Sequence, residues 1–325
     1  MNILVTGGLG YIGSTLSVDL SIKGHTVYCL DRSDNIPLKE RLWSLANDIE
    51  FIKADISCPE ELKKVFESYS FDSIFHLAAS KSVPESEVKY FDYYHNNVVA
   101  SLNLLQASSQ CGVKNFIFAS SAAVYSDKNS YLPENSLLNP LSTYGHTKLI
   151  FEQIINNISK LDQTMKFLTL RFFNPIGYTD SFLAKHFISD GAGLFDILAR
   201  EIQKKNPQFT IYGDNFQSHD GSATRDFISL SSLSEFSIKC FESLSKGEIN
   251  SGEVLNIGSG QGISVIEVIT AFERVFNKKF NIKVAPKREG EIDTSVCSTE
   301  RLLNTFGNIP KNPPLEQIIN SYKLL

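Results

Sequence analysis

The chain has 325 residues, of which 42% are hydrophobic and 21% charged, and its formal net charge at pH 7 is -5. This composition is typical of a globular protein of about two domains, and it lacks the basic excess that nucleic acid or an anionic membrane would require. We therefore expect no nucleic-acid partner and no membrane partner, and we expect a few local cations to hold any anionic ligand.

The cysteines indicate neither a metal site nor a disulfide framework. They are odd in number, scattered along the chain, and form no Cys-x-x-Cys motif or Cys/His cluster. Residues 2–6 already form an apolar strand, and no apolar run reaches membrane-spanning length. We expect a cytoplasmic protein without a bound metal.

The first half of the chain contains short runs rich in Val, Ile, Phe and Leu. Helical patterns lie between most of these runs, which predicts a Rossmann-type, doubly wound parallel sheet with helices on both faces. The predicted strands cover residues 2–6, 26–31, 49–54, 73–78, 115–121 and 166–173.

After residue 173 the pattern changes to a polar loop followed by shorter elements. A helix is predicted near residues 194–204, and short strands at 209–212 and 226–230. Residues 254–257 are similar to another central strand, so the chain should return to the first domain near 230–260. We expect a nucleotide-binding domain at 1–173 with that returning segment, and a smaller interleaved α/β substrate-binding domain, mainly 174–325.

The first candidate site follows the first predicted strand, where residues 6–13 read Thr-Gly-Gly-Leu-Gly-Tyr-Ile-Gly. A glycine-rich turn lets the backbone approach a pyrophosphate, and the next helix offers free N–H groups and a positive dipole end. The second strand ends at Asp31, at the spacing of an acid that binds a ribose 2′-hydroxyl, which favours NAD over NADP. A tight turn with a surface aspartate would leave this order unexplained. The candidate NAD ligands here are Gly7, Gly10, Tyr11, Ile12, Gly13, Asp31 and Arg32.

The second candidate site is Tyr144-Gly145-His146-Thr147-Lys148, in which Tyr144 and Lys148 share one face of a predicted helix. That spacing alone arises by chance, but here it follows the fifth strand, whose end carries Ser121. A cation about 6 Å from a tyrosine hydroxyl lowers its pKa by about two units at an effective dielectric constant near 20. We therefore predict that Lys148 makes Tyr144 a usable base, with Ser121 bonded to the same substrate oxygen.

The glycine spacing and this trio resemble the extended short-chain dehydrogenase/reductase family. The resemblance implies further NAD contacts after the third and fourth strands, with Ile56 at the adenine. It also implies that Asn96 lies in the segment in which an asparagine supports the active-site backbone, although a helix cap is an alternative role for it. The cofactor contacts implied are Asp55, Ile56, Leu77, Ala78, Ala79, Lys81, Asn96, Tyr144, Lys148 and Phe172.

Within that family the chain is similar to the UDP-galactose 4-epimerases. Residues 81–86, 171–177, 220–228 and 285–291 resemble segments that line the nicotinamide and bind the UDP-sugar of those enzymes. The resemblance implies that two arginines clamp the diphosphate, a tyrosine lies near the uracil and a glutamate binds a ribose. In that order they are Arg225, Arg288, Tyr212 and Glu291. The full set of implied substrate contacts is Lys81, Ser121, Tyr144, Asn174, Gly193, Leu194, Tyr212, Arg225, Arg288, Glu291 and Ser295.

Two positions bear on substrate choice. In the epimerases, a tyrosine seven residues beyond the second clamp arginine excludes an N-acetyl group, and this chain has Ser295 there, or Thr294 or Val296 after a one-residue slip. The small residue predicts turnover of UDP-N-acetylglucosamine and UDP-N-acetylgalactosamine. The alternative is that Ser295 is simply a loop residue and that another side chain closes the pocket. Where the epimerases usually have an asparagine pair before a leucine, this chain has Ala192 and Gly193.

The resemblance implies an NAD-dependent 4-epimerase of UDP-hexoses that forms a transient 4-keto sugar. Ala122 and Ala123 follow Ser121 where dehydratases and decarboxylases have acids. A 4-epimerase or decarboxylase for a different nucleotide sugar is the main alternative, and a non-catalytic NAD-sensing protein is a more remote one.

The helix after Tyr144 is apolar over more than one stripe, which indicates a second packing partner. By analogy with the family, this partner would be a second copy of the chain in a four-helix contact across a two-fold axis, and a large internal contact with the second domain is the alternative. The residues of this predicted interface are Ile150, Phe151, Ile154, Ile155, Ile158, Val98, Leu102 and Leu105.

Overall fold

The computed structural model of the protein describes residues 1–125, 131–188, 193–288 and 291–323. The chain divides into two units, each with its own core. The first unit contains Met1–Ser126, Leu137–Phe172 and Ser234–Leu255, and the second contains Asp127–Ser136, Phe173–Leu233 and Asn256–Leu325.

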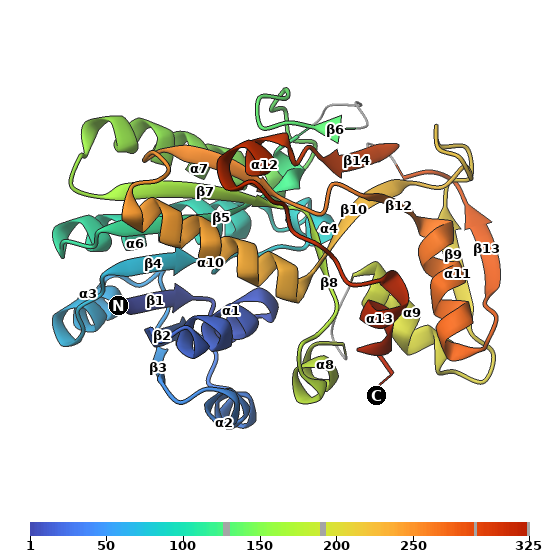
Figure 1. Cartoon of the computed structure of the whole chain (residues 1–325), viewed down its shortest axis with the longest axis horizontal. Coiled ribbons are helices and arrows are strands. Elements are labelled where there is room, and N and C mark those ends of the chain that lie inside the picture. Colours follow the sequence, from blue (N-terminus) through green and yellow to red (C-terminus); the bar gives the residue numbers. More distant parts are fainter. Residues whose placement is uncertain (126–130, 189–192, 289–290, 324–325) are drawn as a thin grey trace. The chain divides into compact units, whose positions relative to one another are not determined.

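The first unit is built on a seven-stranded sheet in the order β11-β7-β5-β4-β1-β2-β3 (Figure 1). The neighbours from β7 to β3 pair in parallel. Each of the six strands predicted in the first half begins at its predicted residue. The seven strands of the sheet are β1 (Asn2–Thr6), β2 (Thr26–Asp31), β3 (Ile49–Lys53), β4 (Ser73–His76), β5 (Asn115–Ser121), β7 (Lys166–Phe172) and β11 (Glu253–Ile257).

The prediction of a central strand at residues 254–257 was wrong in one respect, because β11 lies at the edge of the sheet beside β7. Only its last three residues are buried, and Glu253 and Val254 are partly exposed. A short apolar run indicates burial, but burial can come from covering helices as well as from two flanking strands.

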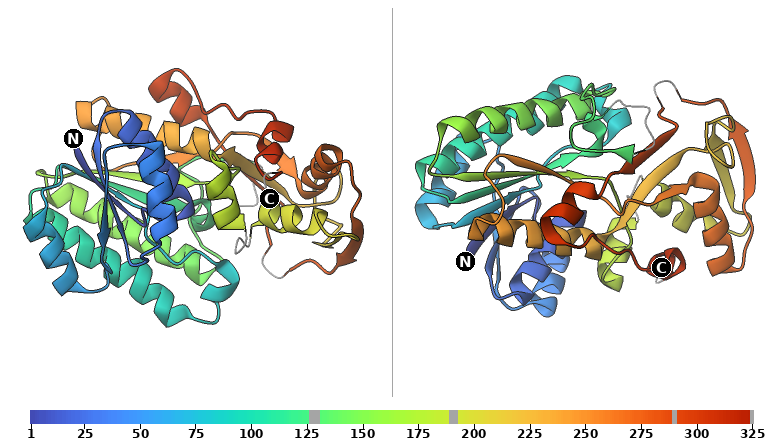
Figure 2. Two further views of the ribbon diagram at one scale, coloured as in Figure 1. Left: turned by 90° about the horizontal axis from the view of Figure 1, so that it is seen from below. Right: turned by 45° about the horizontal axis from the view of Figure 1, so that its top comes forward.

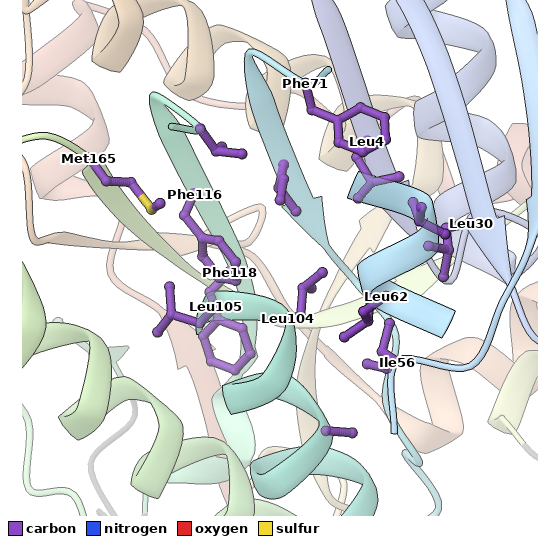
Figure 3. Packing of buried hydrophobic residues seen from close by; sticks show 14 of the residues in the cluster. Leu4, Leu30, Ile56, Leu62, Phe71, Leu104, Leu105, Phe116, Phe118 and Met165 are labelled. Atoms are coloured by element: carbon purple, nitrogen blue, oxygen red, sulfur yellow. The ribbon is translucent and has the colours of Figure 1, made fainter. Parts of the chain in front are cut away.

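Helices cover both faces of this sheet (Figure 2). On one face, α3 (Pro59–Ser68), α6 (Ala100–Gln110) and α7 (Thr143–Leu161) contribute to one apolar core. Figure 3 shows part of that core, with Leu105 of α6 beside Phe118 of β5. On the other face lie α1 (Tyr11–Ile22) and the later part of α10 (Leu230–Lys246). There, the Phe241 ring meets Phe75 of β4 edge to face at 5.3 Å.

The remaining helices of the first unit lie in loops between strands. They are α2 (Ile36–Leu45), α4 (Val83–Ser86), α5 (Tyr90–Tyr94), the π-helical turn η1 (His95–Val99) and the 3-10 turn η2 (Ala122–Val124).

The order of the strands determines where a ligand can bind. From β1 the sheet grows through β2 and β3 in one direction, and from β4 through β5 and β7 in the other. In open parallel sheets, ligands bind at the carboxyl ends of the strands where this order reverses. The glycine turn follows β1 and the small-residue segment follows β4, so both border this reversal point.

The second unit is a smaller α/β assembly with a five-stranded sheet and a two-stranded sheet. The first has the order β12-β10-β14-β6 with β8 also paired to β10, and the second pairs β13 with β9. Its strands are β6 (Tyr131–Leu132), β8 (Asn174–Ile176), β9 (Gln208–Tyr212), β10 (Thr224–Ser229), β12 (Gly262–Ser264), β13 (Asn281–Ala285) and β14 (Thr294–Cys297). Its helices are α8 (Ser181–Ile188), α9 (Leu194–Ile202), α11 (Val265–Phe276), α12 (Glu300–Phe306) and α13 (Leu315–Asn320).

The core of the second unit contains Phe195, Phe272 and Tyr322, which are all buried. Its segments alternate along the chain with those of the first unit, which confirms the predicted fold class. Among the helices that the structure describes, none is long and apolar enough to cross a membrane.

Candidate active site

The glycine turn after β1 is a close-packed backbone feature. Gly7 has a φ of +68°, which L side chains rarely adopt, and a Cβ there would lie 2.9 Å from the Ala78 nitrogen. A Cβ at Gly13 would lie 2.1 Å from the Gly7 oxygen. The helix α1 then begins at Tyr11 with Gly10 as its N-cap and with no side-chain cap. This backbone cradle and uncapped helix start suit the pyrophosphate of a dinucleotide.

Two acids follow neighbouring strands of the same sheet edge. The Asp31 carboxylate, at the end of β2, accepts hydrogen bonds from the Leu9 nitrogen at 3.2 Å and the Ser33 nitrogen at 2.9 Å, which fixes its orientation. Asp55, after β3, accepts from the Ser57 nitrogen at 2.8 Å. Arg32 is exposed, and Ile56 packs into the core of the first unit.

The backbone after β4 is held by Asn97, which was not predicted. Asn97 is buried in η1, donates to the Ser80 carbonyl at 2.9 Å and to the Thr147 hydroxyl at 3.0 Å, and accepts from the Ser80 nitrogen at 2.8 Å. Asn96 donates to the Ser80 hydroxyl at 3.1 Å. The assignment of the backbone-supporting role to Asn96 was therefore wrong by one residue, and so was its alternative as a helix cap, because η1 continues directly from α5. Two adjacent asparagines cannot be told apart until the phase of the helix is known.

His76 lies beneath this segment and is neutral. Its Nδ1 is 2.8 Å from the Thr6 hydroxyl and its Nε2 is 2.7 Å from the Ser101 hydroxyl. Burial first, and the charge of Lys148 second, lower the pKa of His76 to about 3. This side chain therefore ties β1, β4 and α6 together as an uncharged group.

The trio predicted from the sequence comes together at the end of β5. The side chains of Ser121 and Tyr144 are hydrogen-bonded. Lys148 donates to the Ala119 carbonyl at 2.8 Å, and its Nζ lies 5.9 Å from the centre of the Tyr144 ring. The helix α7 that carries the last two begins at Thr143, because the Ser142 side chain caps it by accepting from the Gly145 nitrogen at 3.1 Å.

Burial dominates the electrostatics of this trio in the protein alone. Burial raises the pKa of Tyr144, and the hydrogen bond with Ser121 opposes this change. Burial also lowers the pKa of Lys148 to about 7, while the charge of Glu152 opposes that change. In the protein alone, burial is thus the largest influence on the pKa of Tyr144, and the Lys148 ammonium is bonded to a backbone carbonyl. The effect of Lys148 on Tyr144 stays a prediction for the complex with the cofactor.

In the second unit, Arg225 and Ser295 lie side by side. The strands β10 and β14 are parallel with Arg225 opposite Ser295, so both side chains leave the same face. Thr294 and Val296 belong to the opposite face, and Val296 is buried. Of the three positions considered, Ser295 is the one beside the candidate clamp arginine.

Arg225 is a cation with the carboxylate of Glu291 beside it. Its Nη2 lies 3.6 Å from Oε1 of Glu291. Burial lowers the pKa of Arg225, and the charges of Glu291 and Asp293 oppose this change. The other carboxylate oxygen of Glu291, Oε2, is buried and has no hydrogen-bond partner within the described part of the chain. Such an acceptor suits a ligand hydroxyl.

Arg288 is exposed and stacks on the ring of Tyr212. Its guanidinium carbon is 3.9 Å from the centre of the Tyr212 ring. Asn174, at the start of β8, donates to the Asp226 carbonyl at 2.8 Å. Gly193 is the N-cap of α9 and Leu194 is its first residue. Ala192, like residues 289 and 290 of the second arginine segment, lies outside the described residues.

Asp226 is a further residue that the sequence analysis missed. It is fully buried and accepts from the Ser259 nitrogen at 2.8 Å, the Gly260 nitrogen at 2.9 Å and the Cys297 nitrogen at 3.1 Å. These bonds hold β14 beside β10 and so place Ser295 beside Arg225. The sequence signal that could have identified it is an aspartate directly before the apolar pair Phe227 and Ile228.

A doubly wound sheet with a glycine turn after its first strand and a Ser-Tyr-Lys trio at β5 and α7 defines a short-chain dehydrogenase/reductase. The model of the NAD dependent epimerase/dehydratase family matches residues 3–258, and the chain belongs to this family.

The chain is 36% identical over 319 residues to a UDP-glucose 4-epimerase of Caenorhabditis elegans, covering 91% of this chain and 89% of the relative. It is also similar to a solved UDP-glucose 4-epimerase from Stenotrophomonas maltophila with bound NAD and formylated UDP-arabinopyranose. That likeness has 29% identity, a TM-score of 0.90, and coverage of 100% of this chain and 97% of the other. The UDP-Glc/GlcNAc 4-epimerase of Campylobacter jejuni is similar at 30% identity, with a TM-score of 0.86 and coverage of 99% and 98%.

Proposed function

We propose that the protein is an NAD-dependent 4-epimerase of UDP-hexoses that interconverts UDP-glucose and UDP-galactose through a transient 4-keto sugar. The hydrogen-bonded pair of Ser121 and Tyr144, with Lys148 one helical turn further on, is the observation that carries this proposal. The family and the named activities of the similar proteins support it.

The first unit has the features needed to hold NAD. The glycine cradle of Gly7 and Gly13 with the start of α1 would bind the pyrophosphate, and Asp31 would bind the adenosine ribose. Lys148 and Tyr144 would lie at the nicotinamide ribose. When bound, NAD supplies the acceptor, and later the donor, of the hydride at the sugar C4.

The chain's own residues would transfer the proton of the C4 hydroxyl and hold its oxygen. Tyr144 would remove the proton of the C4 hydroxyl when that carbon is oxidised, and it would return the proton when the carbon is reduced from the opposite face of the sugar. Ser121 holds the same oxygen by a hydrogen bond. Because burial raises the pKa of Tyr144, its ionisation would need the Lys148 ammonium and a further positive charge, which the oxidised nicotinamide would supply.

The turn after Ser121 favours epimerisation over the alternatives. Ala122 and Ala123 form η2 and carry no acid or base, so they cannot assist the loss of water or carbon dioxide. A 4-epimerase for a different nucleotide sugar remains the second candidate, because the trio acts on any hydroxyl at that carbon.

The second unit is proposed as the substrate-binding domain. Arg225 and Arg288 would bind the diphosphate, since guanidinium groups bond phosphate oxygens in pairs. Tyr212 would lie near the uracil. Oε2 of Glu291, which has no hydrogen-bond partner among the described residues, would accept from a ribose hydroxyl. Asn174 would contact the sugar.

Ser295 supports acceptance of N-acetylated sugars. It shares a face with Arg225 and lacks the ring by which a tyrosine would exclude an acetamide group. We expect the protein to interconvert UDP-N-acetylglucosamine and UDP-N-acetylgalactosamine at least as well as the other pair. The test compares kcat/KM for UDP-galactose and UDP-N-acetylgalactosamine in the wild type and in Ser295→Tyr. No turnover of the acetylated sugar by the wild type would end this part of the proposal.

Exposed apolar side chains on α5, η1 and α6 support a homodimer. Phe91 is 76% exposed, Val99 46% and Leu102 42%. Leu105, Phe151 and Ile155, which were predicted to belong to the interface, pack in the core of the first unit instead. Light scattering should give a dimer that Leu102→Glu disrupts and the control Leu161→Glu, at the exposed end of α7, does not. A monomer at micromolar concentration would contradict the proposed dimer.

We also propose that the protein acts in the cytoplasm.

The activity test gives the purified protein UDP-galactose without added cofactor and measures UDP-glucose. Tyr144→Phe should lose nearly all turnover and still bind NAD and UDP, because only the base is removed. Tyr90→Phe, the same change at an exposed tyrosine, is the control. Lys148→Ala should lose activity and bind NAD more weakly. Near-normal turnover in Tyr144→Phe would overturn the mechanism.

A further inference from the structure

A buried ion pair lies behind the trio. Arg171 of β7 and Glu152 of α7 are 3% and 6% exposed, and they meet in a two-pronged contact. The Arg171 Nε is 3.0 Å from Oε1 of Glu152, and its Nη2 is 2.7 Å from Oε2. Removing two charges from water is expensive, and an apolar pair of similar size is often as stable or more so. The presence of this pair therefore suggests a role beyond stability.

The pair joins the helix of the trio to the strand of the trio. Arg171 lies opposite Ser120 in the parallel register of β5 and β7, and the Ser120 hydroxyl donates to Glu152. Arg171 also donates to the Tyr125 hydroxyl at 2.8 Å, just beyond η2. The pair thus contacts α7, β5, β7 and the turn that follows Ser121.

Three consecutive residues of β5 are each held by a side chain of α7. Lys148 bonds the carbonyl of residue 119, Glu152 bonds the hydroxyl of Ser120, and Tyr144 bonds Ser121. The three helix residues are spaced by four, so they form one line along α7. Glu152 is thus the third anchor of the geometry that brings Ser121 and Tyr144 together.

Glu152 also determines the charge around Lys148. Tyr144 and Glu152 act on the ammonium from its own helix, and His76 lies near it from β4. His76 is neutral, because burial lowers its pKa to about 3. Arg171, from β7, is bonded to the carboxylate itself. Among the described groups, Glu152 is the carboxylate whose charge acts on Lys148.

We propose that Glu152, held by Arg171, is a positioning residue for the trio: it fixes α7 against the end of β5 and supplies the buried negative charge that favours the ammonium form of Lys148. This inference rests on the proposed function, because it assigns the charge state that the proposed base requires.

The test is Glu152→Gln, measured on the holoenzyme as the pH dependence of kcat with UDP-galactose. Tyr144 and Lys148 titrate as a coupled pair, and loss of a nearby negative charge lowers the pKa of both. Both limbs of the profile should therefore move to lower pH by roughly one unit. Glu152→Asp, which restores the charge, should return the limbs toward those of the wild type.

Tyr125→Phe is the matched control. It removes the hydrogen bond to Arg171 but leaves both charges, so the limbs should not move. If Glu152→Gln fails to fold because the buried charge of Arg171 has lost its carboxylate partner, the double variant with Arg171→Gln replaces it. The double variant should shift in the same direction by a smaller amount. If the kcat–pH profile of the variant has its limbs at the wild-type pH values and only the rate is lower, the Arg171–Glu152 pair is purely structural. That result would overturn the inference.

A second readout separates this inference from the proposed function. The ultraviolet difference titration of Tyr144, obtained by subtracting the Tyr144→Phe spectrum, reports ionisation without turnover. It should move to lower pH in Glu152→Gln even if UDP-galactose is not a substrate. An unmoved titration would overturn the inference, whereas an inactive wild type with a shifted titration would overturn only the proposed function.

Discussion

Replacing Gly145 by alanine tests how the helix α7 positions the trio. A Cβ at Gly145 would lie 2.4 Å from the Ala123 carbonyl oxygen and 2.9 Å from the Pro140 Cβ. An ordinary carbon to oxygen contact is roughly 3.3 Å, so the first turn of α7 must move by about 0.9 Å, the difference between 3.3 and 2.4 Å. The carbonyl is backbone and cannot turn away. Tyr144 directly precedes this glycine, so its hydroxyl moves relative to Ser121.

Two opposing effects act on the stability of Gly145→Ala. Alanine is a better helix former than glycine by about 1 kcal/mol, which alone would stabilise α7. Forcing an extra carbon into a packed site costs about 1 to 3 kcal/mol, so we expect a lower melting temperature. A displacement near 1 Å at a reacting group costs about 100-fold in rate, and we expect a loss of kcat of that order.

The assay for Gly145→Ala is kcat for UDP-galactose together with the thermal unfolding midpoint. Asn157→Ala is the control, because Asn157 is exposed on the same helix and the change alters helix propensity alone. A variant with wild-type kcat and an unchanged or raised midpoint would refute the reasoning, because it would mean that α7 does not approach η2 closely.

Alanine substitutions in the glycine turn should weaken NAD binding to different extents. A Cβ at Gly13 would lie 2.1 Å from the Gly7 oxygen, and one at Gly10 would lie 3.0 Å from it. Gly13→Ala should therefore lose far more NAD affinity in calorimetry than Gly10→Ala. Equal affinities would contradict this. For Lys148, the pKa is about 7 folded and 10.5 unfolded, so between these values only the unfolded state binds the proton and stability rises with pH. Urea titrations of the NAD-free protein should show this rise, up to about 1.4 kcal/mol per pH unit, and Lys148→Met should abolish it. An unchanged slope would show that Lys148 is not the cause. For His76, the pKa is about 3 folded and 6.5 unfolded, so stability should fall as pH decreases through that window, and less steeply in His76→Gln. Identical acid unfolding of both proteins would exclude this role.

The sequence by itself determined the class of sheet, its strands and the chemistry-bearing residues at the strand ends. Strand starts and the glycine turn depend on local patterns of apolar residues and on backbone conformations that glycine alone adopts easily, so they can be read along the chain. The order of strand, glycine turn, helix and acid is also a property of sequence. The trio could be named because its serine ends one strand and its other two members share one helix.

Only the tertiary structure decided which of two neighbouring residues turns inward and how charges are balanced. Asn97 rather than Asn96 holds the segment after β4, because the phase of η1 depends on its packing. The pKa of Lys148 is lowered by burial that no spacing reveals. Arg171 and Glu152 meet through strands and helices folded together, and Ser295 joins Arg225 through the register of two strands. These features depend on contacts between distant segments, and a single sequence does not encode such contacts in any local pattern.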